Sequence, residues 1–67
     1  MTIREFTVQY ALGTLDFRAL RNIASDKRTS KKILTILSKD ENNIVRYYVA
    51  KNPNTPKEIK DKIRILL

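Results

Sequence analysis

Acid–base or nucleophilic chemistry in this sequence would have to come from seven carboxylates, three tyrosines and eight lysines. Cysteine and histidine are both absent, which excludes thiol nucleophiles, histidine general bases and Cys/His metal sites. Asp40 and Glu41 are neighbours that point apart in a polar turn, and Glu5 and Glu58 are explained by helix capping. The sequence therefore predicts no catalytic site, no metal site and no cofactor, so an enzyme is the least favoured function class.

The basic residues are more informative than the acidic ones. Fourteen Lys and Arg against seven Asp and Glu give a formal net charge of +7, which suggests an acidic partner. Arg4, Lys31 and Lys57 each stand two residues after a threonine, in the first turn of an expected helix. A cation there opposes the helix dipole, whereas an anionic partner at helix N-termini would account for it. Three further cations lie close to Lys31 in the sequence: Lys27, Arg28 and Lys32.

A plainer interpretation of these cations is a solvated surface, since exposed charges are screened within about 8 to 10 Å at physiological salt. The tyrosines also allow two interpretations. Tyr47 and Tyr48 project about 100° apart on a helix, so one of them should be exposed. Either Tyr10 and Tyr48 fill the core while Tyr47 lies at its rim, or Tyr47 beside Arg46 is a contact anchor of the kind enriched at interfaces.

These side chains are positioned by a sequence repeat. Residues 24–33 recur at 50–59 with a constant offset of 26. Four pairs of positions are identical: Ala24 and Ala50, Thr29 and Thr55, Lys31 and Lys57, and Ile33 and Ile59. A weaker copy opens the chain, and we expect one domain, 1–67, with copies at about 2–24, 25–50 and 51–67. The apolar positions that recur between copies should form the core: Ile23, Ile33, Leu37, Val49, Ile59 and Ile63.

Local signals predict three longer helices at about 3–12, 30–39 and 56–66, and shorter ones within 15–24 and 44–50. Thr2 and Thr55 are expected to be N-caps, each with a glutamate that completes a capping box, and Thr29 is expected to be a cap without the box. Pro56 suits the first helical position, and Gly13 should end the first helix. β-branched residues in 44–50 leave a strand as the alternative for that segment. Residues 6–12 also alternate like a strand, but the Thr2–Glu5 box and the Gly13 stop outweigh this pattern.

No targeting or membrane-spanning segment is expected. Arg4 and Glu5 interrupt the stretch where a signal peptide has its apolar core. No uncharged apolar run approaches the roughly 18 residues that cross a bilayer. The default prediction is a cytoplasmic protein with no membrane contact.

Residues 45–56 read Val-Arg-Tyr-Tyr-Val-Ala-Lys-Asn-Pro-Asn-Thr-Pro and precede Ile59 and Ile63. This resembles the leucine-rich-repeat variant family, whose repeat has a Val-Arg-x-x-Val-Ala-x-Asn-Pro-Asn-Thr-Pro core before an apolar helix. The resemblance covers roughly residues 20–67. It implies α-helices alternating with short 3₁₀-type helices, stacked as a right-handed solenoid close to HEAT-type repeats, and it implies no enzymatic activity.

The chain departs from that family in two places. Lys27-Arg28 stand where the motif has Pro-Asn, and residues 40–43 make a longer turn than usual. Some members carry a separate iron–sulfur segment with clustered cysteines, and this cysteine-free chain cannot reproduce it. The predicted fold is thus an all-α, right-handed helical-repeat solenoid of about two and a half repeats, with alternating long and short helices.

The favoured function is a non-catalytic interaction module, a small regulator or inhibitor that docks on an acidic surface of a larger protein. The alternative is sequence-nonspecific nucleic-acid binding through a basic edge formed by Arg4, Lys31 and Lys57 at the helix starts. The candidate contact residues are Arg4, Lys27, Arg28, Lys31, Lys32, Arg46, Tyr47 and Lys57. Ile65, Leu66 and Leu67 end the chain without polar residues, which suggests self-association or cover by a partner.

Overall fold

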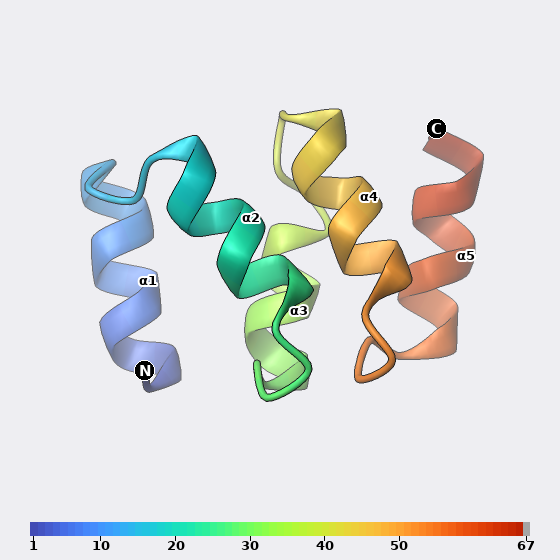
Figure 1. Ribbon diagram of the computed structural model, residues 1–67, viewed down its shortest axis with the longest axis horizontal. Coiled ribbons are helices and arrows are strands. Elements are labelled where there is room, and N and C mark those ends of the chain that lie inside the picture. The colour runs from blue at the N-terminus through green and yellow to red at the C-terminus, as the bar shows by residue number, and fades with distance from the viewer. Residues whose placement is uncertain (67) are drawn as a thin grey trace.

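The computed structural model describes residues 1–66, and their side chains as far as Arg64, and within that range it contains five helices and no strand (Figure 1). The helices are α1 (Ile3–Leu12), α2 (Phe17–Ser25), α3 (Lys31–Leu37), α4 (Asn43–Lys51) and α5 (Lys57–Leu66). The all-helical prediction is confirmed, including the helix over 3–12, and the strand alternative for 44–50 is wrong. The apolar surface predicted at Ile65, Leu66 and Leu67 lies outside the described side chains.

The predicted alternation of long and short helices is wrong. α2 and α4 are α-helices of nine residues each, whereas α3, expected to be long, has seven. α3 ends early because the chain tightens after Leu37: the amides of Lys39 and Asp40 donate to carbonyls three residues back. The Ser38 hydroxyl adds a bond to the Thr35 carbonyl. The polar turn that follows then leads into α4.

α2 and α4 pack side by side and lie in front of α3, while α1 and α5 lie at opposite ends of the molecule (Figure 1). α4 also packs against α5 and α3, and α1 packs against α3. α1, α3 and α5 all begin at the lower edge of Figure 1. The first turns of these three helices therefore share one edge of the molecule.

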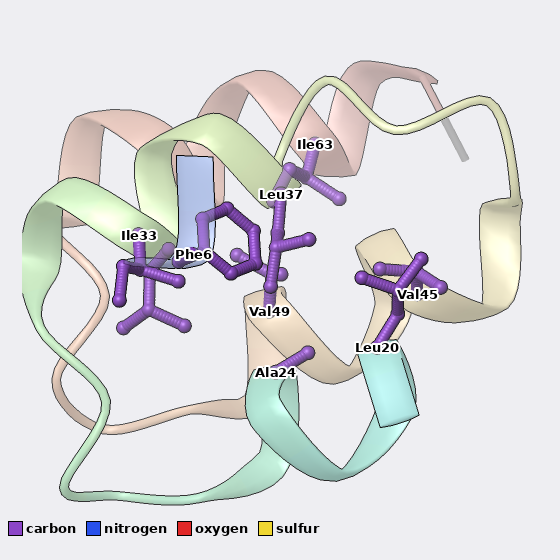
Figure 2. Packing of buried hydrophobic residues seen from close by; sticks show 9 residues of the cluster. Phe6, Leu20, Ala24, Ile33, Leu37, Val45, Val49 and Ile63 are labelled. Carbon is purple, nitrogen blue, oxygen red and sulfur yellow. The ribbon is translucent and has the colours of Figure 1, made fainter. Parts of the chain in front are cut away.

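Every helix contributes to one buried apolar cluster, eight of whose nine members are labelled in Figure 2. The members are Phe6, Leu20, Ala24, Ile33, Leu34, Leu37, Val45, Val49 and Ile63. Four of the six predicted core positions are in this cluster, and the other two, Ile23 and Ile59, pack against it while half-buried. The recurrence of apolar residues between copies thus identified real core positions.

The ends of α1 are as predicted. The Thr2 hydroxyl accepts from the Glu5 amide and the Glu5 carboxylate accepts from the Thr2 amide, both at 3.1 Å. These hydrogen bonds hold the pKa of Glu5 below its usual value. At the other end Gly13 adopts the left-handed conformation, with φ of 72°, and its amide donates to the Tyr10 carbonyl.

The predicted caps of the other two helices are wrong by one residue. Ser30, and not Thr29, caps α3, accepting from the Ile33 amide at 3.3 Å. α5 begins at Lys57, and the Pro56 carbonyl accepts its first hydrogen bonds, so Pro56 is not the first helical residue. The hydroxyl of Thr55 points backwards and donates to the Val49 carbonyl. The last carbonyls of a helix have no donor within that helix, and the Thr55 hydroxyl satisfies one of them.

Two turns 26 residues apart share the same hydrogen bonds. The Thr29 hydroxyl donates to the Ile23 carbonyl at 2.6 Å, and the Thr55 hydroxyl to the Val49 carbonyl at 2.7 Å. Within each turn the threonine amide donates to the carbonyl three residues back. The backbone amide of the residue before the threonine also donates to a side-chain oxygen. Arg28 donates to Asp26 and Asn54 donates to Asn52, in both cases at 2.9 Å.

The second turn is hydrogen-bonded to the first. The Asn52 side chain is only 2% exposed, and its amide donates to the carbonyls of Ala24 and Asp26 at 2.8 and 2.9 Å. The side-chain amide of Asn54 donates to the Thr29 carbonyl at 2.7 Å. Because these bonds are largely shielded from water, their loss would leave carbonyls unsatisfied. They fix the end of α2 relative to the end of α4.

We predict that Asn52→Asp destabilises the protein at neutral pH by more than about 2 kcal/mol, since a carboxylate has no N–H to give to two buried carbonyls. The protonated acid can donate one bond, so folding raises the pKa of the new carboxyl above its unfolded value of about 4. The loss of unfolding free energy relative to the natural chain is therefore smallest below about pH 4, and it grows as pH rises through the folded-state pKa.

Urea unfolding of both chains at several pH values measures this deficit. Asn43→Asp is the control, because Asn43 is exposed in the first turn of α4, where an acid is tolerated. An unchanged urea midpoint for Asn52→Asp at neutral pH would contradict the structural role of Asn52.

We predict that Ile63→Ala costs about 2 to 5 kcal/mol because the side chain is 1% exposed in the core. Ile59→Ala should cost less, since Ile59 is half-buried, and Val8→Ala on the exposed face of α1 should stay within about 0.5 kcal/mol. Urea unfolding gives each value. If Ile63→Ala has no folded baseline, Ile63→Val should still lose about 0.5 to 1.5 kcal/mol, and equal stability of that variant would refute the assignment.

Candidate binding surface

Three predicted contact residues lie in the first turns of the helices that begin at the same edge. Arg4 is the second residue of α1, and Lys31 and Lys57 are the first residues of α3 and α5. All three are exposed, and the three helices start together at the lower edge of Figure 1. The spacing read from the sequence therefore corresponds to helix starts that share one side of the molecule.

The helix ends themselves offer less to an anion than the sequence suggested. Thr2 and Ser30 already accept from backbone amides of α1 and α3. Glu5 and Glu58 add two carboxylates in first turns at this edge. The side-chain cations, rather than free N–H groups, must supply most of the attraction for an anionic partner.

The central cations differ from one another. Lys27, Arg28 and Lys32 are all exposed. Arg28 forms an ion pair with Asp26 at 3.2 Å, which is the only ion pair within residues 1–66. Hydrogen bonds from Arg28 hold the pKa of the Asp26 carboxyl below its usual value. Part of the Arg28 charge is therefore neutralised, while the two lysines keep theirs for solvent or a partner.

A hollow of about 510 Å³ opens where the start of the chain meets the turn between α2 and α3. Its lining includes Met1, Ile23 and Ile33 together with the Asp26–Arg28 pair and Ser30. Asp26, Arg28 and Ser30 of the lining already bond within the chain. The hollow lies beside Arg28 and adds shape to the surface that carries the central cations.

Arg46 does not accompany Tyr47. Its guanidinium turns to the α3–α4 turn, where Nη1 donates to the Asp40 carbonyl and Nε is buried without a hydrogen bond to a described residue. Tyr47 is 43% exposed and lies beside Lys51, whose Nζ is 5.0 Å from the ring centre. Residues four apart are neighbours on a helix, whereas adjacent ones diverge, so the spacing of Tyr47 and Lys51 was the signal that sequence reasoning missed.

The sequence analysis also missed Phe17 of α2, which is an exposed aromatic residue like Tyr47 of α4. Phe17 is 40% exposed at the start of α2, and the Arg21 guanidinium lies 6.0 Å from its ring centre. Hydrogen bonding and charge interaction with Tyr47 raise the pKa of Lys51. Each of the two helices thus carries an exposed ring beside a cation.

Asp40 is not the solvated turn residue that was expected. Its carboxylate accepts from the Tyr10 hydroxyl at 2.5 Å and from the Asn42 amide at 2.8 Å. Burial and this contact with a carboxylate raise the pKa of Tyr10 to about 12. The acid therefore links α1 to the α3–α4 turn, with Arg46 on its backbone carbonyl.

Within residues 1–66 no group of three or more carboxylates could hold a metal ion. None of the helices in that range has both the length and the apolar character needed to cross a bilayer.

The Tyr10 contact predicts a pH dependence. In the variant Tyr47→Phe, Tyr48→Phe, the remaining tyrosine should ionise at about pH 12 instead of 10. Because the folded-state pKa is raised, the stabilisation is complete below pH 10 and is lost as pH rises towards 12. Phenolate absorbance and far-ultraviolet circular dichroism follow ionisation and unfolding together. Adding Asp40→Asn should lower the pH midpoint of tyrosine ionisation. If this midpoint is unchanged while the protein stays folded, Tyr10 does not contact Asp40.

The function of this surface has to be inferred from its own residues. A scan against protein-family models and searches of the curated proteins and of the solved structures find no match to this chain. The resemblance of residues 45–56 to the leucine-rich-repeat variant family stays a prediction.

Proposed function

We propose that this protein is a non-catalytic interaction module that docks on an acidic surface of a larger protein. The observation that carries the proposal is the basic edge, the six exposed cations grouped where α1, α3 and α5 begin: Arg4, Lys27, Arg28, Lys31, Lys32 and Lys57. Five of the six form no ion pair with a described residue. An acidic partner would complement this charge and speed association.

The positions of the carboxylates support a non-catalytic role. Glu5 caps α1, Asp16 caps α2, Asp26 pairs with Arg28 and Asp40 holds Tyr10. A catalytic acid or base needs a carboxylate that is free to exchange a proton with a substrate. Four of the seven carboxylates are thus engaged in holding the fold.

Repeat stacking is the architecture we propose for this module, with copies at about 2–24, 25–50 and 51–67 in a right-handed solenoid. The matching hydrogen bonds of the turns at 26–29 and 52–55 support it, as do the bonds from Asn52 and Asn54 to the earlier turn. Stacked repeats place equivalent positions in a row, which is how a solenoid presents an extended binding surface. A small cytoplasmic regulator or inhibitor is consistent with such a short array.

Nucleic acid is the second candidate partner, because the same row of cations suits phosphates. Salt dependence separates the two. If about six phosphates are contacted, the logarithm of the affinity falls with the logarithm of salt at a slope near −5, whereas a protein interface responds far less.

The variant Arg4→Glu, Lys31→Glu, Lys57→Glu tests the basic edge. Acids suit first helical turns by about 0.3 to 1 kcal/mol each, so the fold should persist or gain slightly. Partner binding should weaken by at least about tenfold. Quantitative capture from native cells, followed by affinity measurement on the protein recovered, gives the result.

The control for charge alone is Lys39→Glu, Lys62→Glu, Arg64→Glu, which changes the net charge equally at exposed positions away from the basic edge. It should bind nearly as the natural chain does. If the basic-edge variant keeps the natural affinity and salt dependence, the edge is only a solvated surface.

A further inference from the structure

The outer side of α2 and α4 carries a second surface of different chemistry. Neither helix contains an acidic residue. The two helices pack side by side (Figure 1). We use the name α2–α4 face for six residues on their outer side: Phe17, Arg18, Arg21, Ile44, Tyr47 and Lys51. Three of these are cations and three are apolar or aromatic.

The six residues form one surface because of their spacing. Phe17 and Arg21 are four apart on α2, and Ile44, Tyr47 and Lys51 are three and four apart on α4, so each set lies along one side of its helix. Arg18 and Arg21 stand 26 residues before Ile44 and Tyr47. They therefore occupy matching outward positions on two neighbouring helices.

The apolar part of the face is substantially open to solvent. Phe17 is 40% exposed, Ile44 47% and Tyr47 43%. A single exposed apolar residue is ordinary on a protein surface, but three on adjacent helices, interleaved with cations, are typical of a contact surface. Arginine and tyrosine are also among the residues that contribute most to binding at interfaces.

Both rings are held by their own cations. The Arg21 guanidinium lies 6.0 Å from the Phe17 ring centre, and the Lys51 ammonium 5.0 Å from that of Tyr47. Such cation–π contacts restrict side chains before a partner arrives. Binding then loses less side-chain entropy, which favours these groups as anchors.

We propose that the α2–α4 face binds an acidic amphipathic segment of the partner protein. Apolar side chains of that segment pack on Phe17, Ile44 and Tyr47, and its carboxylates pair with the cations of the same face. The inference rests on the proposed function as an interaction module and names the chemistry of the partner. Nine residues of helix extend about 13 Å, which matches about two turns of a partner helix.

Cations attract an acidic peptide and nucleic acid alike, and the character of the apolar residues favours the protein segment. Ile44, the most exposed apolar member, cannot stack with a base and is suited to packing against aliphatic side chains.

The probe is a fluorescein-labelled synthetic helical peptide with leucine on one side and glutamate on the other, titrated with the full chain and followed by anisotropy. We expect saturable binding that weakens by at least about tenfold with Tyr47→Ala or Ile44→Ala. Val8→Ala and Leu12→Ala, which truncate exposed apolar residues of α1, are matched controls and should bind as the natural chain does. Circular dichroism and urea midpoints establish that each variant is folded.

Amide chemical-shift changes locate the peptide, and we expect them along α2 and α4. Failure of the peptide to bind, or shifts confined to the basic edge, overturns the proposal. Tighter binding of single-stranded oligothymidylate than of the peptide at this face overturns it too. If only the basic-edge variant loses the peptide, this inference fails while the proposed function stands. If only the face variants lose it, the inference stands and the basic edge is not the site.

Discussion

The buried side-chain amide of Asn52 connects the two halves of the molecule. Its two donors reach carbonyls at the end of α2, 28 and 26 residues earlier in the chain, and so fix α2 beside α4. That pairing aligns the outer sides of both helices. It also fixes the two turns after which α3 and α5 begin. Both candidate surfaces, the basic edge and the α2–α4 face, depend on this one alignment.

Features governed by neighbouring residues could be predicted from the sequence. The Thr2–Glu5 capping box and the Gly13 stop follow from residues a few positions apart. The core positions Ile33 and Ile63 follow from apolar residues that recur 26 positions apart. The threonines of the later turns were misassigned because a hydroxyl can accept from the helix ahead or donate to the helix behind. Only the position of the Val49 carbonyl shows that Thr55 does the second.

Contacts between distant residues account for the remaining errors. The hydrogen bond of Asp40 crosses 30 residues to Tyr10, and no local pattern marks either side chain for it. Arg46 was expected at the surface beside Tyr47, but the same turn draws its guanidinium inwards. The candidate site was thus predictable for cations at helix starts, which repeat along the chain. On α4 the four-residue spacing of Tyr47 and Lys51 also carried a local signal, whereas the inward turn of Arg46 depends on tertiary packing.

The hydrogen bonds between the two turns run one way, and a single atom accounts for this. Asp26 occupies the position equivalent to Asn52, but it has an oxygen where Asn52 has its amide nitrogen, and it pairs with Arg28 instead of reaching another turn. A turn placed ahead of residues 26–29 would receive no hydrogen bond from Asp26. A carboxylate at that position has no N–H to donate to carbonyls of another turn, whereas the side-chain amide of Asn52 donates to two of them.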